Sequence, residues 1–201
     1  MGKVDVNKQQ KESSLLKTAF EFFTTKGFSK TSISDIVNNA GVAKGTFYLY
    51  FKDKYDIRNR LVSHKSSQLF SNAIAELGDS INDIPFEDKL IKIIDNIINQ
   101  LNANQSLLTF ISKNLSWGIF KNALTSPTSE DDINFSDIYN TMLKEAPYDL
   151  KDPEIMMFMI IELVSSTCYS AILYKEPCSV EELKPYLYDS IRTMVARHRV
   201  G

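Results

Sequence analysis

The residues of this chain with the clearest chemical purpose lie in one stretch, TSISDIVNNAGVAKGTFYLYFKDK, from Thr31 to Lys54. It reads as two short helices joined at Gly41, with lysine and tyrosine side chains gathered on and just after the second helix. Lysine ammonium groups neutralise phosphate charge, and hydroxyl groups hydrogen-bond to phosphate oxygens. The polar candidates are Lys44, Thr46, Tyr48, Tyr50 and Lys54. We therefore interpret this stretch as an element that reads DNA.

The first of the two helices is expected to begin at Ser32. The Ser32 hydroxyl can cap a helix, and Asp35, three residues later, favours the same N-terminus. A buried stripe at helical spacing follows, made by Ile33, Ile36, Val37 and Ala40. Gly41 then fits the left-handed conformation that ends a helix. These signals predict a short helix and a sharp turn.

The second helix and the segment before the first complete a small core. The second helix is expected over residues 44–51, with Phe47 and Phe51 four residues apart on its inward face. An apolar helical pattern precedes both, made by Leu15, Leu16, Ala19, Phe20 and Phe23. Gly27 is expected to end that helix, with Phe28 folding back toward Phe23. Three helices around one aromatic core are predicted.

The run from Leu15 to Leu61, above all GVAKGTFYLYFKDKYDI, resembles the DNA-binding domain of the tetracycline-repressor (TetR) family of bacterial transcription regulators. The resemblance implies that the start of the second helix is a recognition helix in the major groove, where it reads base edges. The base-reading residues would be Lys44, Gly45 and Thr46, with Gly45 permitting close approach. The phosphate-binding residues would be Ser32, Tyr48, Tyr50 and Lys54.

Two positions depart from the family pattern. Ala43 stands where serine is usual, so no side chain caps the start of the recognition helix. Only backbone N–H groups can bind a phosphate there. Tyr55 stands where glutamate is common, which moves the acidic residue of the next helix to Asp56. Neither change removes a core position.

Charge is divided unevenly along the 201 residues. Residues 1–60 hold 11 Lys and Arg against 6 Asp and Glu, whereas residues 61–201 hold 12 against 19. The net charges are therefore +5 and −7, although the whole chain carries only −2. A basic end on an acidic protein predicts that this end meets a polyanion.

Helical runs separated by short breakers continue through the rest of the chain. They are expected at about 53–78, 87–102, 105–124, 133–146, 153–175 and 179–198. The predicted fold is therefore all-α with about nine helices. We expect a helix-turn-helix DNA-binding domain at 8–60, with its motif at about 32–51, and a ligand-binding and dimerisation domain at 61–201.

The segment 155–174, IMMFMIIELVSSTCYSAILY, is apolar nearly all round. Its length would suit a membrane span, but Glu162 near its middle and the hydroxyl-bearing residues after it favour a soluble helix. Such a helix needs both its own core and a second partner surface. The last helix offers a matching stripe, made by Leu183, Leu187, Ile191 and Met194. Helices 153–175 and 179–198 of two chains are thus expected to form a four-helix homodimer interface, as the resemblance also implies.

The larger domain is expected to hold a mostly apolar cavity for a small hydrophobic or cationic effector. The candidate ligand-binding residues are Phe110, Asn114, Trp117, Tyr139, Met142, Glu162 and Tyr169. Aromatic and methionine side chains at helical spacing fit an ordinary core equally well, and that interpretation stays open. Glu162 could bind a cationic ligand, pair with an arginine such as Arg192 across the dimer, or face water.

These features predict a sequence-specific transcription regulator that a small molecule releases from a near-palindromic operator. The resemblance implies that repression is the more common mode of regulation. The alternative is a DNA-binding or protein-interaction module without an effector. An enzyme is not expected, because His64 and His198 lie in unrelated segments and no phosphate loop appears. Neither a cofactor nor a metal is expected. Cys168 and Cys178 are expected to be free thiols, and the polar N-terminus predicts a cytoplasmic protein.

Overall fold

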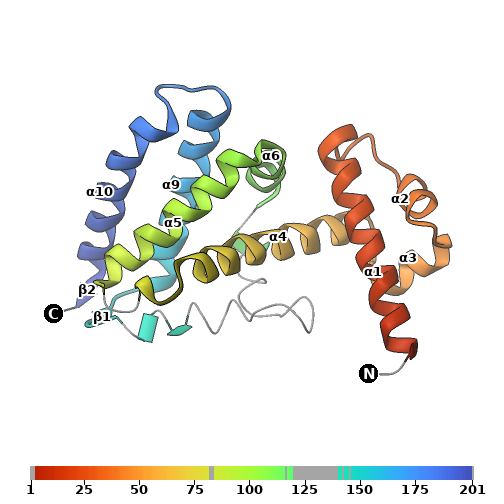
Figure 1. Ribbon diagram of the computed structural model, residues 1–201, viewed down its shortest axis with the longest axis horizontal. Coiled ribbons are helices and arrows are strands. Elements are labelled where there is room, and N and C mark those ends of the chain that lie inside the picture. Colours follow the sequence, from red (N-terminus) through yellow and green to blue (C-terminus); the bar gives the residue numbers. More distant parts are fainter. Residues whose placement is uncertain are drawn as a thin grey trace. The chain divides into compact units, whose positions relative to one another are not determined.

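The computed structural model describes residues 3–81, 84–115, 117–119, 140–141, 143–144 and 146–200, and the structural statements below concern these residues. Contacts divide the chain into two compact units, Met1–His64 and Lys65–Gly201. The described residues form helices apart from one antiparallel ladder of two residues on each side (Figure 1). The all-α prediction is therefore confirmed.

The N-terminal unit contains α1 (Lys3–Phe22), the π-helical turn η1 (Phe23–Gly27), α2 (Ile33–Ala40), α3 (Lys44–Tyr50) and the start of α4 (Lys54–Leu77). Glycine ends two of these elements as predicted, because Gly27 and Gly41 have φ angles of 90° and 67°. After Gly41, the backbone N–H of Val42 donates to the carbonyl of Val37 at 3.0 Å, as in a Schellman stop. The turn between α2 and α3 is thus closed by backbone hydrogen bonds.

One apolar core holds these helices together. Its fully buried members include Leu15, Ala19, Ile36, Phe47, Phe51, Ile57 and Leu61. The rings of Phe47 and Phe51 lie 5.4 Å apart, and Phe28 folds back to within 5.2 Å of Phe23. The predicted aromatic pairs of the small domain are therefore present. Ile57 and Leu61 belong to α4, so the first turns of α4 are part of the unit that α1 to α3 begin.

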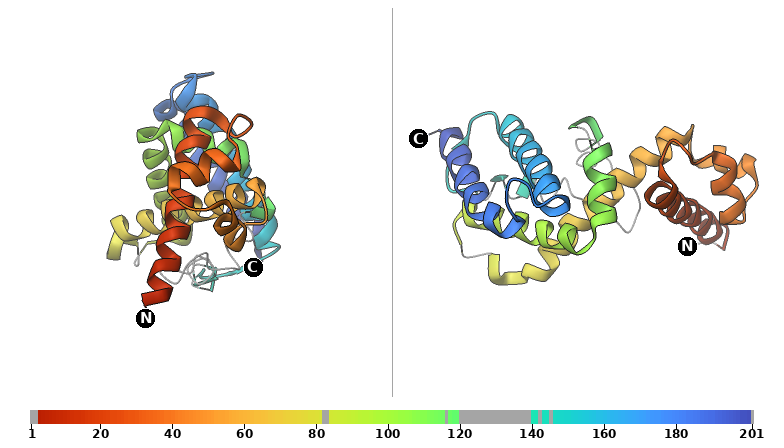
Figure 2. Two further views of the ribbon diagram at one scale, coloured as in Figure 1. Left: turned by 90° about the vertical axis from the view of Figure 1, so that its right-hand side faces the viewer. Right: turned by 90° about the horizontal axis from the view of Figure 1, so that it is seen from above.

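The C-terminal unit contains the rest of α4, η2 (Gly78–Ile81), α5 (Phe86–Ala103), α6 (Gln105–Asn114), α9 (Pro153–Leu173) and α10 (Val180–His198). Helices α9 and α10 lie side by side, α10 also packs on α5, and α6 packs on both α5 and α9 (Figure 2). Strands β1 (Asp149–Leu150) and β2 (Arg199–Val200) form the short ladder. Four of the predicted helices agree with the structure within two residues at each end: 53–78, 87–102, 153–175 and 179–198.

The predicted single helix over 105–124 is wrong. Helix α6 ends at Asn114 because Leu115 takes an extended conformation, with φ −70° and ψ 127°. A separate helical segment follows at Trp117–Ile119, and residues 120–124 lie outside the described residues. Most of the predicted helix 133–146 also lies outside them, although residues 140–141 and 143–144 are helical.

Helix α9 is long and apolar enough, by length and composition alone, to cross a membrane. It packs against α6 and α10, and its buried side chains are Met156, Ile160, Cys168, Ala171 and Ile172. Another face of the helix is exposed in the single chain, where Ile155, Phe158 and Met159 are 54%, 40% and 45% accessible. An apolar helix with one exposed face is expected to bury that face against another surface.

Polar contacts join distant parts of the C-terminal unit. Tyr148 donates a hydrogen bond of 2.6 Å to the buried carboxylate of Glu87, and Arg199 forms an ion pair with the same carboxylate. The Arg199 guanidinium also lies 4.2 Å from the centre of the Tyr148 ring. The end of the chain is thereby fixed to α5.

Candidate nucleic-acid interface

Ser32 and Asp35 form a complete capping box at the start of α2, as the spacing predicted. The backbone N–H of Asp35 donates to Ser32 Oγ at 3.0 Å, and the backbone N–H of Ser32 donates to Asp35 Oδ2 at 2.8 Å. Lys26 Nζ lies 2.9 Å from the same carboxylate oxygen. The hydrogen bond from the Ser32 backbone, followed by the Lys26 contact, lowers the pKa of Asp35 from 3.8 to about 2. The α2 cap is therefore anionic at neutral pH.

The N-terminus of α3 presents its backbone without a side-chain cap. Ala43 is the N-cap residue and makes no side-chain hydrogen bond, as its departure from the family pattern predicted. Lys44 and Gly45 are exposed, whereas Thr46 is half-buried. A Cβ atom built at Gly45 would meet nothing within 4 Å, and the backbone there has no positive φ. The domain itself therefore gives no packing reason for glycine at this position.

The two candidate tyrosines differ in how far they are engaged. Tyr48 is 52% exposed, and its ring meets the buried Phe47 ring edge-on at 5.4 Å. Tyr50 is half-buried, and its hydroxyl donates to the backbone carbonyl of Lys8 in α1 at 3.1 Å. Tyr48 is thus available to an external phosphate, whereas the Tyr50 hydroxyl already links α3 to α1.

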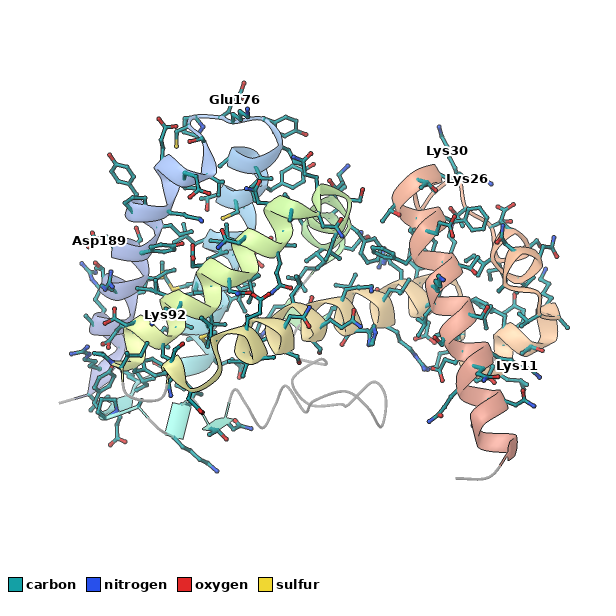
Figure 3. All side chains as sticks on the ribbon, viewed as in Figure 1. Lys11, Lys26, Lys30, Lys92, Glu176 and Asp189 are labelled. Carbon is teal, nitrogen blue, oxygen red and sulfur yellow. The ribbon has the colours of Figure 1, made fainter. Side chains whose placement is uncertain are left out.

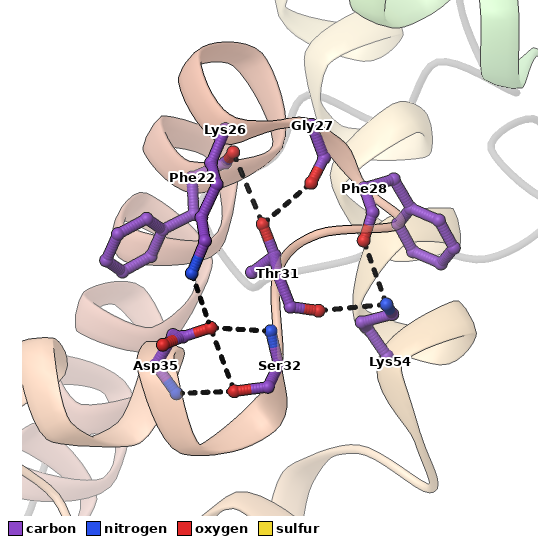
Figure 4. Close-up of polar contacts among 8 residues, drawn as sticks. All are labelled: Phe22, Lys26, Gly27, Phe28, Thr31, Ser32, Asp35 and Lys54. Atoms are coloured by element: carbon purple, nitrogen blue, oxygen red, sulfur yellow. Dashed lines mark hydrogen bonds and ion pairs between the residues drawn. The ribbon is translucent and has the colours of Figure 1, made fainter.

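Lys54 is held inside the domain rather than extended from it (Figure 4). Its ammonium group donates to the carbonyls of Phe28 at 2.8 Å and Thr31 at 2.9 Å, and it lies 4.4 Å from the centre of the Phe28 ring. An ammonium group has three donors, so these bonds occupy two of them. The side chain fixes the segment between η1 and α2 to the start of α4.

Basic side chains of the N-terminal unit include Lys11, Lys26 and Lys30, which Figure 3 labels. All three are exposed, and Lys26 approaches the Phe22 ring at 5.9 Å. In the C-terminal unit the labelled side chains have mixed charge, with Lys92 on α5 and the acidic Glu176 and Asp189 elsewhere. The basic side chains that Figure 3 labels in the N-terminal unit are therefore exposed to solvent.

Described residues of the C-terminal unit line a partly open cavity of about 150 Å³ between α4, α5, α6 and α9. Most of its wall is aliphatic or aromatic, and the residues with polar side-chain atoms are Ser66, Ser112, Ser165 and Cys168. Burial raises the pKa of the Cys168 thiol to about 11, so it stays protonated at neutral pH. Neither cysteine is in a disulfide, as predicted.

The five predicted ligand residues that the structure describes do not line this cavity. Among them, Phe110 is buried elsewhere in the core, Asn114 donates to the Phe110 carbonyl at 2.6 Å, and Trp117 donates to Glu154 at 3.2 Å. Glu162 is exposed, and Tyr169 meets the Tyr174 ring at 5.9 Å. Arg192, suggested as a partner for Glu162, pairs with Asp88 at 2.6 Å within the same chain.

Two further predicted ligand residues, Tyr139 and Met142, lie outside the described residues. Ser66, by contrast, lines the cavity although no sequence pattern pointed to it, because one serine in a long helix gives no signal. The searched part of the chain contains no group of His, Cys, Asp or Glu side chains able to hold a metal ion.

The sequence of this chain is similar to a known protein family and to individual bacterial regulators. The model of the tetR family of bacterial regulatory proteins matches residues 15–61. The uncharacterized HTH-type regulator YvdT of Bacillus subtilis is 40% identical over 67 residues, which cover 33% of this chain and 32% of YvdT. The fatty acid metabolism regulator of the same organism is 29% identical over 100 residues, half of each chain. The matched region spans between a third and a half of these two relatives.

Solved structures resemble the fold along nearly the whole chain. A tetR family transcription regulator from Shewanella sp. PV-4 superposes with a TM-score of 0.66 and 15% identity, covering 95% of this chain and 99% of its own. The regulator FadR from Bacillus subtilis, solved with stearoyl-CoA, has a TM-score of 0.61 and 20% identity, covering 92% and 97%. At these identities the likeness establishes the fold alone.

The family model and the structural likeness cover different parts of the chain. The family model falls on the capped α2, the glycine turn and α3, and the structural likeness extends through the C-terminal helices. Residues 15–61 therefore belong to the tetR family of bacterial regulatory proteins, and the whole described chain shares the fold of solved tetR family regulators.

Proposed function

We propose that the chain is a dimeric repressor that reads a near-palindromic operator through the start of α3. The observation that carries the proposal is Gly45, whose missing side chain leaves open space at an exposed helix N-terminus. Backbone N–H groups at such a terminus attract phosphate, and a glycine lets another backbone or a base approach closely. Lys44, Gly45 and Thr46 are the proposed base-reading residues.

Phosphate contacts are proposed for exposed groups around this helix. Tyr48 is the best placed, because its ring is supported by Phe47 and more than half of its surface is exposed. Ser32 is exposed, but its hydroxyl already donates to Asp35 at 2.9 Å, so a phosphate would compete with that carboxylate. Tyr50 and Lys54 are engaged within the domain, and we assign them a positioning role. This assignment departs from the phosphate role that the family resemblance implied.

The dimer is proposed to form through α9 and α10. The exposed Ile155, Phe158 and Met159 on α9 offer an apolar surface that a second copy could cover. Tyr186 on α10 is 75% exposed and extends the candidate surface. Two copies related by a two-fold axis would place their recognition helices about 34–36 Å apart, one turn of DNA.

Control by a small effector is proposed for the C-terminal unit, in a cytoplasmic protein. The apolar cavity beside α4 supports it, because a ligand bound there would contact the helix that continues from the DNA-binding core. A ligand that prefers the DNA-incompatible arrangement lowers operator affinity by its differential binding, and operator DNA weakens the ligand equally.

Selection of bound sequences from a random DNA pool, at one fixed salt concentration, tests the DNA-reading proposal. A two-fold motif with two similar half-sites is expected, since each α3 would read one half. Recovery of unrelated sequences would instead favour the alternative, a DNA-binding or protein-interaction module without base preference. Lys44→Ala and Thr46→Ala proteins should lose preference at particular base pairs of that motif.

A further inference from the structure

Among the described residues that line the cavity of the C-terminal unit, Ser66 has a buried polar atom without a partner. The Ser66 hydroxyl oxygen is buried and forms no hydrogen bond with the described residues. Ser66 belongs to α4 and lines the cavity together with apolar side chains such as Leu69, Phe86 and Ile160. Buried hydroxyl groups nearly always have a hydrogen-bond partner, so an unpartnered one needs an explanation.

Four hydroxyl groups on other helical elements of this chain form local hydrogen bonds. Thr24, Thr167, Ser190 and Thr193 each donate to the carbonyl four residues earlier, at 2.7 to 3.0 Å. Ser66 makes no such bond, although the same kind of acceptor is available to a helical serine. Its hydroxyl is therefore left for a partner that the described part of the folded chain does not supply.

The wall around Ser66 is uncharged. Among the described lining residues none is Asp, Glu, Lys, Arg or His, and the Cys168 thiol is neutral at physiological pH. An ion enclosed by such a wall would lose its hydration without gaining a counter-charge. The sequence predicted a small hydrophobic or cationic effector, and a cationic one is disfavoured because Glu162 is exposed and outside the described wall.

Size limits the ligand further. The cavity of about 150 Å³ matches the volume of engineered apolar cavities that bind benzene. We infer that the cavity binds a small, uncharged, mainly apolar molecule with one hydroxyl or similar group, which hydrogen-bonds to Ser66. This inference names the ligand class of the proposed effector site and rests on the proposed function only for its link to DNA.

Four molecules of similar size test the inference: benzyl alcohol, toluene, benzoate and benzylammonium. Titration calorimetry on the full chain at pH 7, without DNA, should detect the alcohol and toluene but neither ion. In a Ser66→Ala protein the alcohol should bind up to about tenfold more weakly while toluene is unchanged, because only the alcohol loses a hydrogen bond. Ser190→Ala is the matched control, since this exposed hydroxyl on α10 donates to Tyr186 and lies outside the cavity wall.

Three results would overturn the inference: binding of either ion as tightly as the alcohol, no binding of any of the four, or equal weakening of alcohol and toluene by Ser66→Ala. Thermal unfolding of the ligand-free proteins separates a ligand contact from damage to the fold. Ser66→Ala should be at least as stable as the wild type, because it removes an unpartnered buried hydroxyl. Operator affinity measured without ligand reports separately on the proposed function.

Discussion

Gly45→Ala separates the demands of DNA binding from those of folding. Gly45 is the second residue of α3, its added Cβ would meet nothing within 4 Å, and its φ is not positive. Alanine should therefore stabilise the folded protein by about 0.5–1 kcal/mol, by reducing the backbone freedom of the unfolded chain. For a chain of this length the gain corresponds to a rise of roughly 1–4 °C in Tm.

DNA binding should change in the opposite direction. If the start of α3 approaches base edges as closely as glycine permits, a methyl group there should weaken operator binding by about tenfold or more, equivalent to about 1.4 kcal/mol. Gly118→Ala is the matched control, because that glycine is also helical, lacks a positive φ and has open space at its Cβ. It lies in the C-terminal unit, so it should leave operator affinity unchanged.

Fluorescence anisotropy with a selected operator, at a temperature where all proteins are folded, measures the affinities. Thermal unfolding followed by circular dichroism measures the stabilities. The reasoning would be refuted if Gly45→Ala raised Tm as expected and still bound the operator within twofold of the wild type. Gly45 would then be a chance occupant of an exposed helix position.

Three further predictions concern Lys54, the α2 cap and the dimer. Lys54→Met should destabilise the fold by about 1–3 kcal/mol in urea unfolding, because two carbonyls lose a charged donor. The salt dependence of its operator binding should stay unchanged, and a slope reduced by about one would make Lys54 a phosphate contact. NMR titration should give Asp35 a pKa of about 2, below its ordinary value of 3.8. The stability that the ionised Asp35 contributes should therefore be complete above about pH 3.8 and be lost as the pH falls toward 2. A measured pKa of 3.8 would exclude the capping geometry. Met159→Glu should raise the dimer dissociation constant, measured by sedimentation, by at least about tenfold, because a charge would be buried unpaired at the proposed interface. Lys92→Glu, at an exposed position on α5, is the control and should leave that constant unchanged. Equal dissociation constants for the two variants would place the interface elsewhere.

Local signals in the sequence were sufficient for the helix-turn-helix frame. Ser32 and Asp35 are three residues apart, so the capping box follows from spacing alone. Gly41 supplies a left-handed residue and Val42 closes the turn one residue later. Such features depend only on residues within about one helical turn, so tertiary contacts elsewhere in the chain do not change them.

The roles of individual side chains could not be predicted in the same way. The resemblance implies a phosphate contact at Lys54, and this stays a prediction; in the structure its ammonium group donates to the carbonyls of Phe28 and Thr31, 26 and 23 residues away in sequence. The helix break at Leu115 was also missed, since neither glycine nor proline stands at Asn114 or Leu115 to mark it. Periodicity holds no information about such distant contacts, and it marks a helix end only where a breaker is present.

The sequence by itself determined the all-α class, the N-terminal DNA-binding frame and the basic end of an acidic chain, because caps, glycine stops, apolar spacing and charge are properties of the local sequence. Only the tertiary structure decided which polar groups remain available. In the structure, Lys54 and Tyr50 donate hydrogen bonds to backbone carbonyls within the domain, and Glu162 is exposed. The Ser66 hydroxyl is buried without a partner among the described residues. The physical reason is that a polar group's availability depends on which donors and acceptors folding brings beside it.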